Sequence, residues 1–137
     1  MRLPARAEFE KVTSSPSASF TYRRIIGKHF AAPYHYHPEM ELTWIVHSSG
    51  HRFVGDHIEP FNAGDLVLLG SNLPHVWLNH PDCARAETVV VQFLPEFLGH
   101  GFFDLPEMSI VRRLFDRAAR GVCFSPTARK KVSHSLS

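Results

Sequence analysis

The chain has 137 residues, enough for one domain with a hydrophobic core and too few for two of ordinary size. Apolar residues make up 44% of it and charged residues 20%, as in an ordinary soluble globular protein. It contains no run of about 18 apolar residues, which excludes a membrane-spanning helix. Its first residues lack the apolar segment of a secretory signal. We expect a cytoplasmic, single-domain protein without a membrane partner.

The formal net charge is +2, too small to indicate nucleic-acid binding by the chain as a whole. Residues 112–131 nevertheless hold seven of the fifteen lysines and arginines. A solvated helix face is the simpler interpretation, and a basic surface beside a neighbouring DNA-binding module is the alternative. Cys83 and Cys123 form no metal-type pair, so we interpret them as free thiols in a reducing compartment.

After an irregular lead-in over residues 1–18, the chain reads as a series of short extended segments. They are rich in β-branched and aromatic residues and are separated by Gly, Pro, Asn and Asp. The segments cover residues 19–32, 35–46, 51–61, 65–70, 74–79 and 88–94. Short strands at such close intervals predict an antiparallel sandwich or barrel.

The pattern changes at Pro106, where apolar residues begin to recur with the period of an amphipathic helix over residues 107–119. Gly121 is expected to end this helix, and Ser125 followed by Pro126 predicts the start of a second helix over 126–136. No partner element is visible for the apolar stripe of the second helix, which indicates a truncated chain or a frayed natural terminus. We therefore divide the chain into a barrel (1–105) and a helix pair (106–137).

The first helix carries an apolar stripe that either docks on the barrel or is buried in a dimer, and we expect some of each. Its residues are Ile110, Val111, Leu114 and Phe115.

Four potential metal ligands have suggestive spacing. His35 and His37 are two residues apart and share one face of a strand, and Glu41 has the same parity. His75 lies on a later segment that faces them in a closed barrel. Three imidazoles and a carboxylate suit a divalent ion such as Zn, Ni, Mn or Fe, although the set could also be a relic that binds none. Glu39 could replace Glu41 if Pro38 introduces a bulge.

Trp77 and Asn79 share a strand face with His75, and we count them, with Glu39, as candidate ligand-binding residues. An aromatic wall beside polar groups suits a sugar or a small organic acid, and it suits a packed core equally well.

Two motifs resemble those of the cupins. His35-x-His37-x3-Glu41 is similar to the first cupin motif, and Gly64-x5-Gly70-x-Asn72-x2-His75-x3-Asn79 is similar to the second. The second has Gly70 where the cupins usually have Pro and Asn72 where they have Gly, and the closing glycine of the first, matched by Gly50, comes two positions late. The resemblance implies a mainly β fold, a cupin-type antiparallel β-barrel (a double-stranded β-helix or jelly roll), followed by the C-terminal helices.

A longer resemblance covers residues 35–46, 50–79 and 89–99, which are similar to the N-terminal sensor domains of AraC-family transcription regulators. It implies a small-molecule effector in the barrel, a homodimer built through the helix pair, and DNA binding by a helix-turn-helix domain that this chain lacks. We therefore expect no enzymatic activity. The alternative is a stand-alone cupin metalloenzyme of dioxygenase or isomerase type, although no general base is visible outside the ligand set. A purely structural dimerisation module would not need the histidines.

Overall fold

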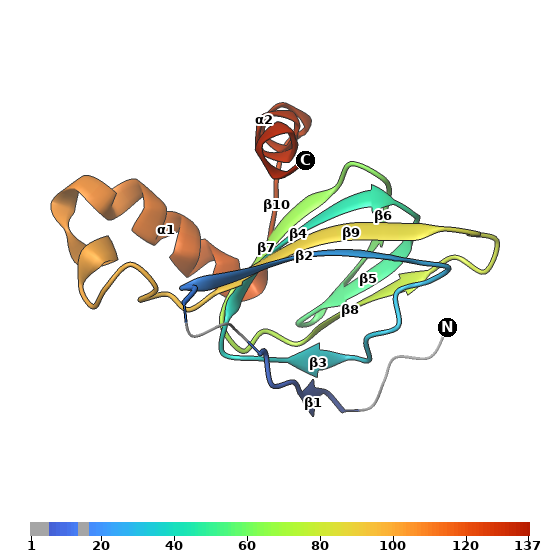
Figure 1. The fold of residues 1–137 in the computed structure, drawn as a ribbon, viewed down its shortest axis with the longest axis horizontal. Helices are drawn as coiled ribbons and strands as arrows, with labels where there is room; N and C mark the ends of the chain where they lie inside the picture. The colour runs from blue at the N-terminus through green and yellow to red at the C-terminus, as the bar shows by residue number, and fades with distance from the viewer. Residues whose placement is uncertain (1–5, 14–16) are drawn as a thin grey trace.

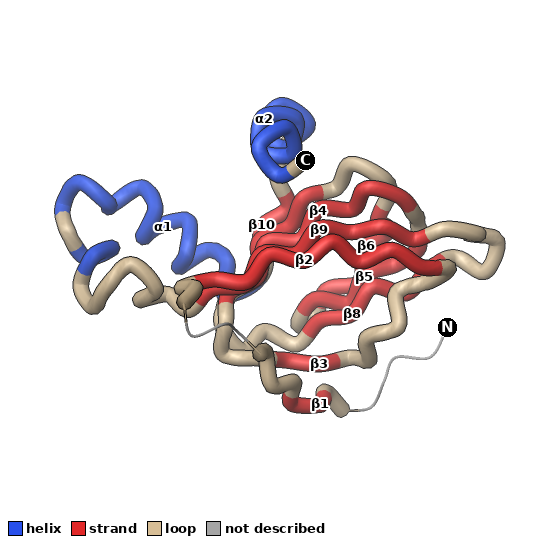
Figure 2. Tube along the Cα trace, in the orientation of Figure 1, coloured by secondary structure: helices blue, strands red, loops and turns tan. Residues whose placement is uncertain are grey.

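The computed structural model describes residues 6–13 and 17–137, and its strands form two sheets that face each other (Figures 1 and 2). The first sheet contains, in spatial order, β1 (Glu8–Phe9), β3 (His35–Tyr36), β8 (His75–Asn79), β5 (Gly50–Val54) and β6 (His57–Phe61). The second contains β10 (Val122–Cys123), β7 (Leu66–Leu69), β4 (Met40–His47), β9 (Ala86–Phe93) and β2 (Phe20–Gly27). All neighbours are antiparallel except β1 and β3. The mainly β, antiparallel barrel expected from the sequence is confirmed.

The segment 35–46 is split into β3 and β4 by a turn over residues 37–39. Pro38 lies in this turn, because proline cannot donate a ladder hydrogen bond. The glycine at 50 also has a local cause. A Cβ at Gly50 would lie 1.9 Å from the carbonyl oxygen of Leu78, so only glycine fits where the chain enters β5.

The core has two parts. Between the sheets, six buried residues pack together, namely Ile45, Val54, Phe61, Val67, Leu69 and Trp77. On the outside of the second sheet, Met40, Leu68 and Ala118 form a smaller cluster, and Leu114 and Phe115 pack against it. The barrel thus has a core of its own, and the first C-terminal helix docks on its outer side.

The C-terminal segment contains both predicted helices. The first is α1 (Ser109–Arg117), flanked by short 3-10 turns at Pro106–Met108 and Ala118–Arg120. The 3-10 turn after α1 ends at Gly121, whose φ of +83° is in the left-handed region that favours glycine. The second is α2 (Pro126–Leu136), where the Ser125 side chain accepts a hydrogen bond from the Ala128 amide and Pro126 is the first helical residue. The start signal in the sequence is confirmed.

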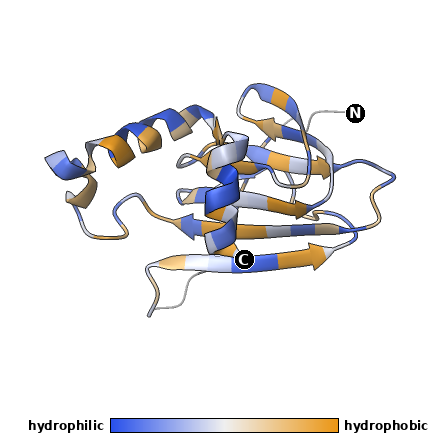
Figure 3. Ribbon diagram, turned by 90° about the horizontal axis from the view of Figure 1, so that it is seen from above, coloured by the Kyte–Doolittle hydropathy of each residue, from blue (hydrophilic) through white to orange (hydrophobic). Residues whose placement is uncertain are grey.

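Between the two helices, β10 pairs with β7, so the segment 106–137 also contributes a strand to the barrel. The helix α2 then crosses the outer face of the second sheet (Figures 1 and 3). The hydroxyl of Tyr22 donates to the Leu136 carbonyl at 2.8 Å, and Arg129 pairs with Asp65 at 2.8 Å. These polar contacts tie α2 to the barrel, and neither uses an apolar side chain of the helix. They could not be seen in the sequence because they join residues that lie far apart in it.

The apolar stripe on α1 is divided between two environments. Leu114 and Phe115 pack on the barrel, Val111 is half-buried, and the side chain of Ile110 is 74% exposed. No helix among the described residues is long and apolar enough to cross a membrane.

Candidate functional site

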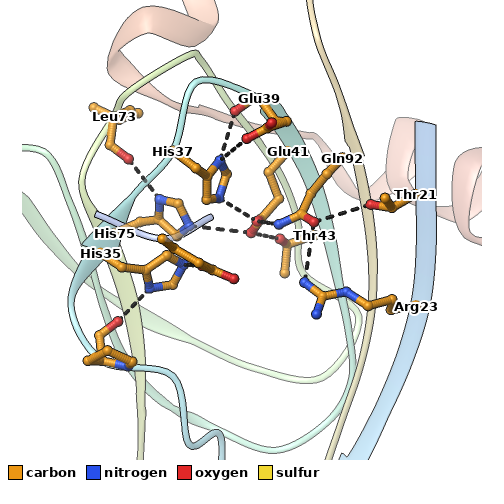
Figure 4. A network of polar contacts seen from close by, with 12 residues as sticks. Thr21, Arg23, His35, His37, Glu39, Glu41, Thr43, Leu73, His75 and Gln92 are labelled. Carbon is orange, nitrogen blue, oxygen red and sulfur yellow. Dashed lines mark hydrogen bonds and ion pairs between the residues drawn. The ribbon is translucent and has the colours of Figure 1, made fainter. Parts of the chain in front are cut away.

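Four side chains from three elements and a turn meet between the two sheets (Figure 4). His35 lies on β3 directly opposite His75 on β8, His37 follows β3, and β4 brings in Glu41 from the second sheet. All four are buried, and one potential ligand atom from each lies within 4.8 Å of all the others. The structure thus brings together the four residues that the sequence predicted as metal ligands.

The three imidazole rings are oriented in the same way by the backbone. The Nδ1 atoms of His35, His37 and His75 lie 2.5, 3.0 and 2.7 Å from the carbonyl oxygens of Pro33, Glu39 and Leu73, respectively. A carbonyl only accepts, so each Nδ1 carries the hydrogen. In the neutral rings the Nε2 atoms then present lone pairs, which is the tautomer that a metal ligand needs.

The Glu41 carboxylate lies among these Nε2 atoms. Its Oε1 is 3.1 Å from Nε2 of His37, and its Oε2 is 3.6 Å from Nε2 of His75. Two further side chains fix its orientation: the Thr43 hydroxyl donates to Oε2 at 2.7 Å and the Gln92 amide donates to Oε1 at 2.9 Å. The carboxylate therefore holds one position without a metal.

The proton distribution follows from burial and proximity. Burial alone would raise the pKa of Glu41, but the hydrogen bond from His37 and the proximity of His75 hold it well below its ordinary value. Burial lowers the pKa of His37, and the hydrogen bond and charge of Glu41 outweigh it, so the net shift is upward. Burial and the neighbouring His75 lower the pKa of His35. Without a metal, a proton between His37 and Glu41 is thus favoured on the His37 ring.

The arrangement fits a divalent cation. Nε2 of His75 is buried and has no hydrogen-bond partner among the described residues, so one lone pair is left for an ion. Two ligand atoms that share an ion at about 2.1 Å lie about 3.0–3.4 Å apart. The distances of 3.1 and 3.6 Å from Glu41 to the two rings are close to this range. Three imidazoles and a carboxylate suit Zn, Ni, Mn or Fe.

A pocket of about 200 Å³ adjoins the cluster, and it is lined from both sheets. His35, Glu41 and His75 form part of its wall. Its apolar wall includes Ile25, Phe30, Ala31, Ala32, Ile45, Val76, Trp77 and Val90. Its other polar residues are Glu10, Arg23, Thr43, Thr88 and Gln92. Nε1 of Trp77 is buried without a hydrogen-bond partner among the described residues, so this donor is available to a bound molecule.

The structure places the other two predicted ligand-binding residues outside the pocket wall. Asn79 accepts a hydrogen bond from the Phe30 amide and donates one to the Ser48 hydroxyl, so it ties two loops together. Glu39 orients His37 through its backbone carbonyl, while its carboxylate is 3.9 Å from the same ring. Of the two glutamates considered, it is Glu41 that reaches the cluster.

Three residues of the site were missed by sequence analysis. Thr43 has the same strand parity as Glu41, a signal that could have identified it. Gln92 and Glu10 are far from the histidines in the sequence, and only the pairing of β9 with β4 and of β1 with β3 brings them there.

Fold and site together define a cupin-type β-barrel with appended helices. No protein-family model matches the chain, and no curated protein is similar to it in sequence. Among solved structures, a cupin 2 conserved barrel domain protein from Salinispora arenicola CNS-205 is 20% identical, with a TM-score of 0.51 over 65% of this chain and 76% of that chain.

ToxT from Vibrio cholerae is 13% identical, with a TM-score of 0.57 over 88% of this chain and 48% of ToxT. A second ToxT structure, from Vibrio cholerae O395, is bound to (E)-4-(8-methylnaphthalen-1-yl)but-3-enoic acid. It is 12% identical, with a TM-score of 0.57 over 87% of this chain and 48% of that chain. The chain thus spans about half the length of ToxT. These likenesses concern the fold alone.

Proposed function

We propose that this chain is the effector-sensing and dimerisation domain of an AraC-type transcription regulator. A small molecule would bind in the barrel, and His35, His37, Glu41 and His75 would hold a divalent metal in the wall of its pocket. The observation that carries the proposal is that the buried ligand cluster opens onto a pocket between the sheets. ToxT, an AraC-family regulator, supports it through a similar fold over 88% of this chain. DNA would be bound by a separate helix-turn-helix domain.

The pocket lining favours an effector with an apolar body and one acidic group over a sugar. Most of the wall is apolar, and burying apolar ligand surface there contributes about 25 cal/mol per Å². The Arg23 guanidinium supplies a positive charge, and the free Nε1 of Trp77 supplies a donor to an oxygen. The naphthyl butenoic acid bound to ToxT has this chemistry.

The strand β2 offers a route from the effector to the C-terminal helices. Successive side chains of a strand point to opposite faces. Arg23 faces the pocket, while the hydroxyl of its neighbour Tyr22 donates to the last turn of α2. A ligand that displaces this edge strand would shift α2. The effect is bounded by the difference in ligand affinity between the two arrangements, typically about 1–3 kcal/mol.

Calorimetry with the naphthyl butenoic acid and with a monosaccharide tests the effector class. We expect the acid to bind and Arg23→Gln to weaken it at least tenfold, because a charged hydrogen bond contributes about 1.5–3 kcal/mol. Arg24→Gln is the matched control, since Arg24 pairs with Glu87 and does not line the pocket. Binding of the monosaccharide alone would contradict the proposed effector class, and binding of neither would contradict the sensor.

The assembled ligand set also favours a second candidate, a cupin metalloenzyme of dioxygenase or isomerase type. The free Nε2 of His75 and the adjoining pocket would allow an ion to face a substrate. Oxygen uptake or isomer formation by the metal-loaded protein with a bound acid would favour this enzyme. Stoichiometric binding without turnover would favour the sensor.

A further inference from the structure

The N-terminal strand β1 is attached to the barrel next to the ligand cluster. It pairs in parallel with β3, where the Glu8 amide donates to the Tyr34 carbonyl and the Glu10 amide donates to the Tyr36 carbonyl, both at 3.0 Å. The strand has only two residues, and Phe9 is 60% exposed although its ring contacts Tyr36. Burial of apolar surface therefore contributes little to holding this strand in place.

The strand delivers a second carboxylate to the site. Oε2 of Glu10 lies 2.9 Å from Nε2 of His35. The two carboxylates divide the three rings between them, because Glu41 contacts His37 and His75, and Glu10 contacts His35. Glu10 also lines the pocket, so it stands where the cluster and the pocket meet.

The contact between Glu10 and His35 lacks a hydrogen when the ring is neutral. Nδ1 of His35 donates to the Pro33 carbonyl, so Nε2 presents a lone pair, and an ionised carboxylate also only accepts. Two acceptors 2.9 Å apart need a proton or a cation between them. Glu41 has the same relation to its two rings, so the site as a whole has more acceptors than hydrogens.

Charge balance points the same way. A divalent ion held by three neutral imidazoles and Glu41 would leave one uncompensated positive charge in a buried place, and buried charges are normally paired. A second carboxylate neutralises it.

We infer that Glu10 is a further metal ligand, so that an ion in the cluster also fastens the N-terminal strand to the barrel. This inference rests on the proposed metal site. Ion binding and docking of β1 are then linked. An ion that binds more tightly when β1 is docked must stabilise the docked strand by the same factor.

Zn²⁺ and Co²⁺ are the probes for this inference, and Glu10→Gln is compared with Glu8→Gln, a loss of the same charge two residues away. We expect Glu10→Gln to weaken Zn²⁺ binding by about 10- to 100-fold, the range found when groups that support a metal site are removed. We also expect it to change the visible absorption of bound Co²⁺. In wild-type protein, Zn²⁺ should slow hydrogen exchange in residues 6–13, and Glu10→Gln should abolish that protection. Glu8→Gln should behave as wild type in all three measurements.

The measurements distinguish a failure of Glu10 as a ligand from a failure of the metal centre as a whole. If Glu10→Gln matches wild type in Zn²⁺ affinity, Co²⁺ spectrum and exchange, or if Glu8→Gln changes them as much, Glu10 is not a ligand while the metal centre and the proposed function stand. If wild-type protein binds neither ion, the metal centre fails and the inference with it. Circular dichroism of both variants confirms that the barrel is intact.

Discussion

His37 lies between the backbone carbonyl of Glu39 on one side of its ring and the Glu41 carboxylate on the other. This position determines how protons compete with a metal. All three rings must be neutral to bind a metal. The pKa of His37 is raised above 6.5, because the effect of Glu41 is larger than the opposing effect of burial. Glu41, with its pKa held well below 4.5, remains ionised throughout the same range.

Zn²⁺ affinity should therefore fall as the pH drops, beginning above 6.5, the ordinary pKa of histidine. The direction of this pH dependence follows from His37. Its pKa is raised, so the ring stays protonated up to a higher pH than a free imidazole, and the ion must compete with that proton at a higher pH. Competition titrations with a chelator of known affinity between about pH 5.5 and 8.5 measure this. An affinity that stays flat over that range would mean that no histidine loses a proton on binding.

Changing His35 and His37 together to Ala should abolish metal binding while the barrel remains folded. The residues that form the core between the sheets are not ligands, so the β-sheet signal in circular dichroism should persist. Elemental analysis after dialysis and supply of Zn, Ni, Mn or Fe gives the metal content. His57 and His80, which are more than half exposed, changed together to Ala provide the control. Equal metal content in both double variants would exclude the cluster as the binding site.

The spacing of the two motifs was enough to predict the four ligands, although His35, His37 and Glu41 do not share one strand: His37 lies in the turn after β3, and Glu41 lies on β4 in the other sheet. Strand parity wrongly placed Asn79 beside His75 in the pocket. It shares the strand of His75, but at the strand end its amide is engaged by the Phe30 backbone and Ser48. Glu10 had no signal at all, since a lone acidic residue in an irregular segment gives no indication of which strand it will meet.

Among the elements, apolar strands and the capped helix could be predicted, whereas the two-residue strands β1 and β10 could not. β7 and β9 were visible as apolar runs, and α2 was visible from Ser125 and Pro126. The strands β1 and β10 form because β3 and β7 offer them free backbone groups, and the local sequence gives no indication of such a pairing.

The junction between the barrel and the helices depends on Gly70. Its amide donates to the Ala118 carbonyl at 2.7 Å, and a Cβ at position 70 would lie 2.7 Å from that oxygen and 2.9 Å from the Cα of Ala119. These are backbone atoms with little freedom to move. Gly70→Ala should therefore lower the free energy of unfolding by about 1–3 kcal/mol.

Urea denaturation measures the effect, and Gly27→Ala serves as the control. A Cβ at Gly27 meets its nearest atom at 3.5 Å, an ordinary contact, so that change should stay within about 0.5 kcal/mol of wild type. Equal stabilities of the two variants would show that the turn after α1 can move away from β7.

For the whole molecule, the division of the α1 stripe indicates which residue a second copy would contact. Leu114 and Phe115 already pack against the barrel, so the exposed Ile110 is the stripe residue that remains available for a dimer contact. We expect Ile110→Glu to shift the proposed dimer to monomer in sedimentation velocity without loss of thermal stability. Ile58→Glu is the control, because Ile58 is 57% exposed on β6 and outside the helices. A monomeric wild-type protein at high concentration would rule out the dimer.

The hydrogen bonds that aim the three imidazoles also have a consequence for evolution. The main-chain oxygens of Pro33, Glu39 and Leu73 accept these hydrogen bonds, so the orientation of the rings does not depend directly on the side chains at these positions. In a saturation mutagenesis experiment scored by metal retention, positions 33 and 39 should tolerate most residues, whereas position 73 should retain an apolar residue because Leu73 packs against the core between the sheets. Insertions or deletions of a single residue beside them should not be tolerated, because they would displace the carbonyls. The spacing of the site, more than the identity of its flanking residues, is what selection would preserve.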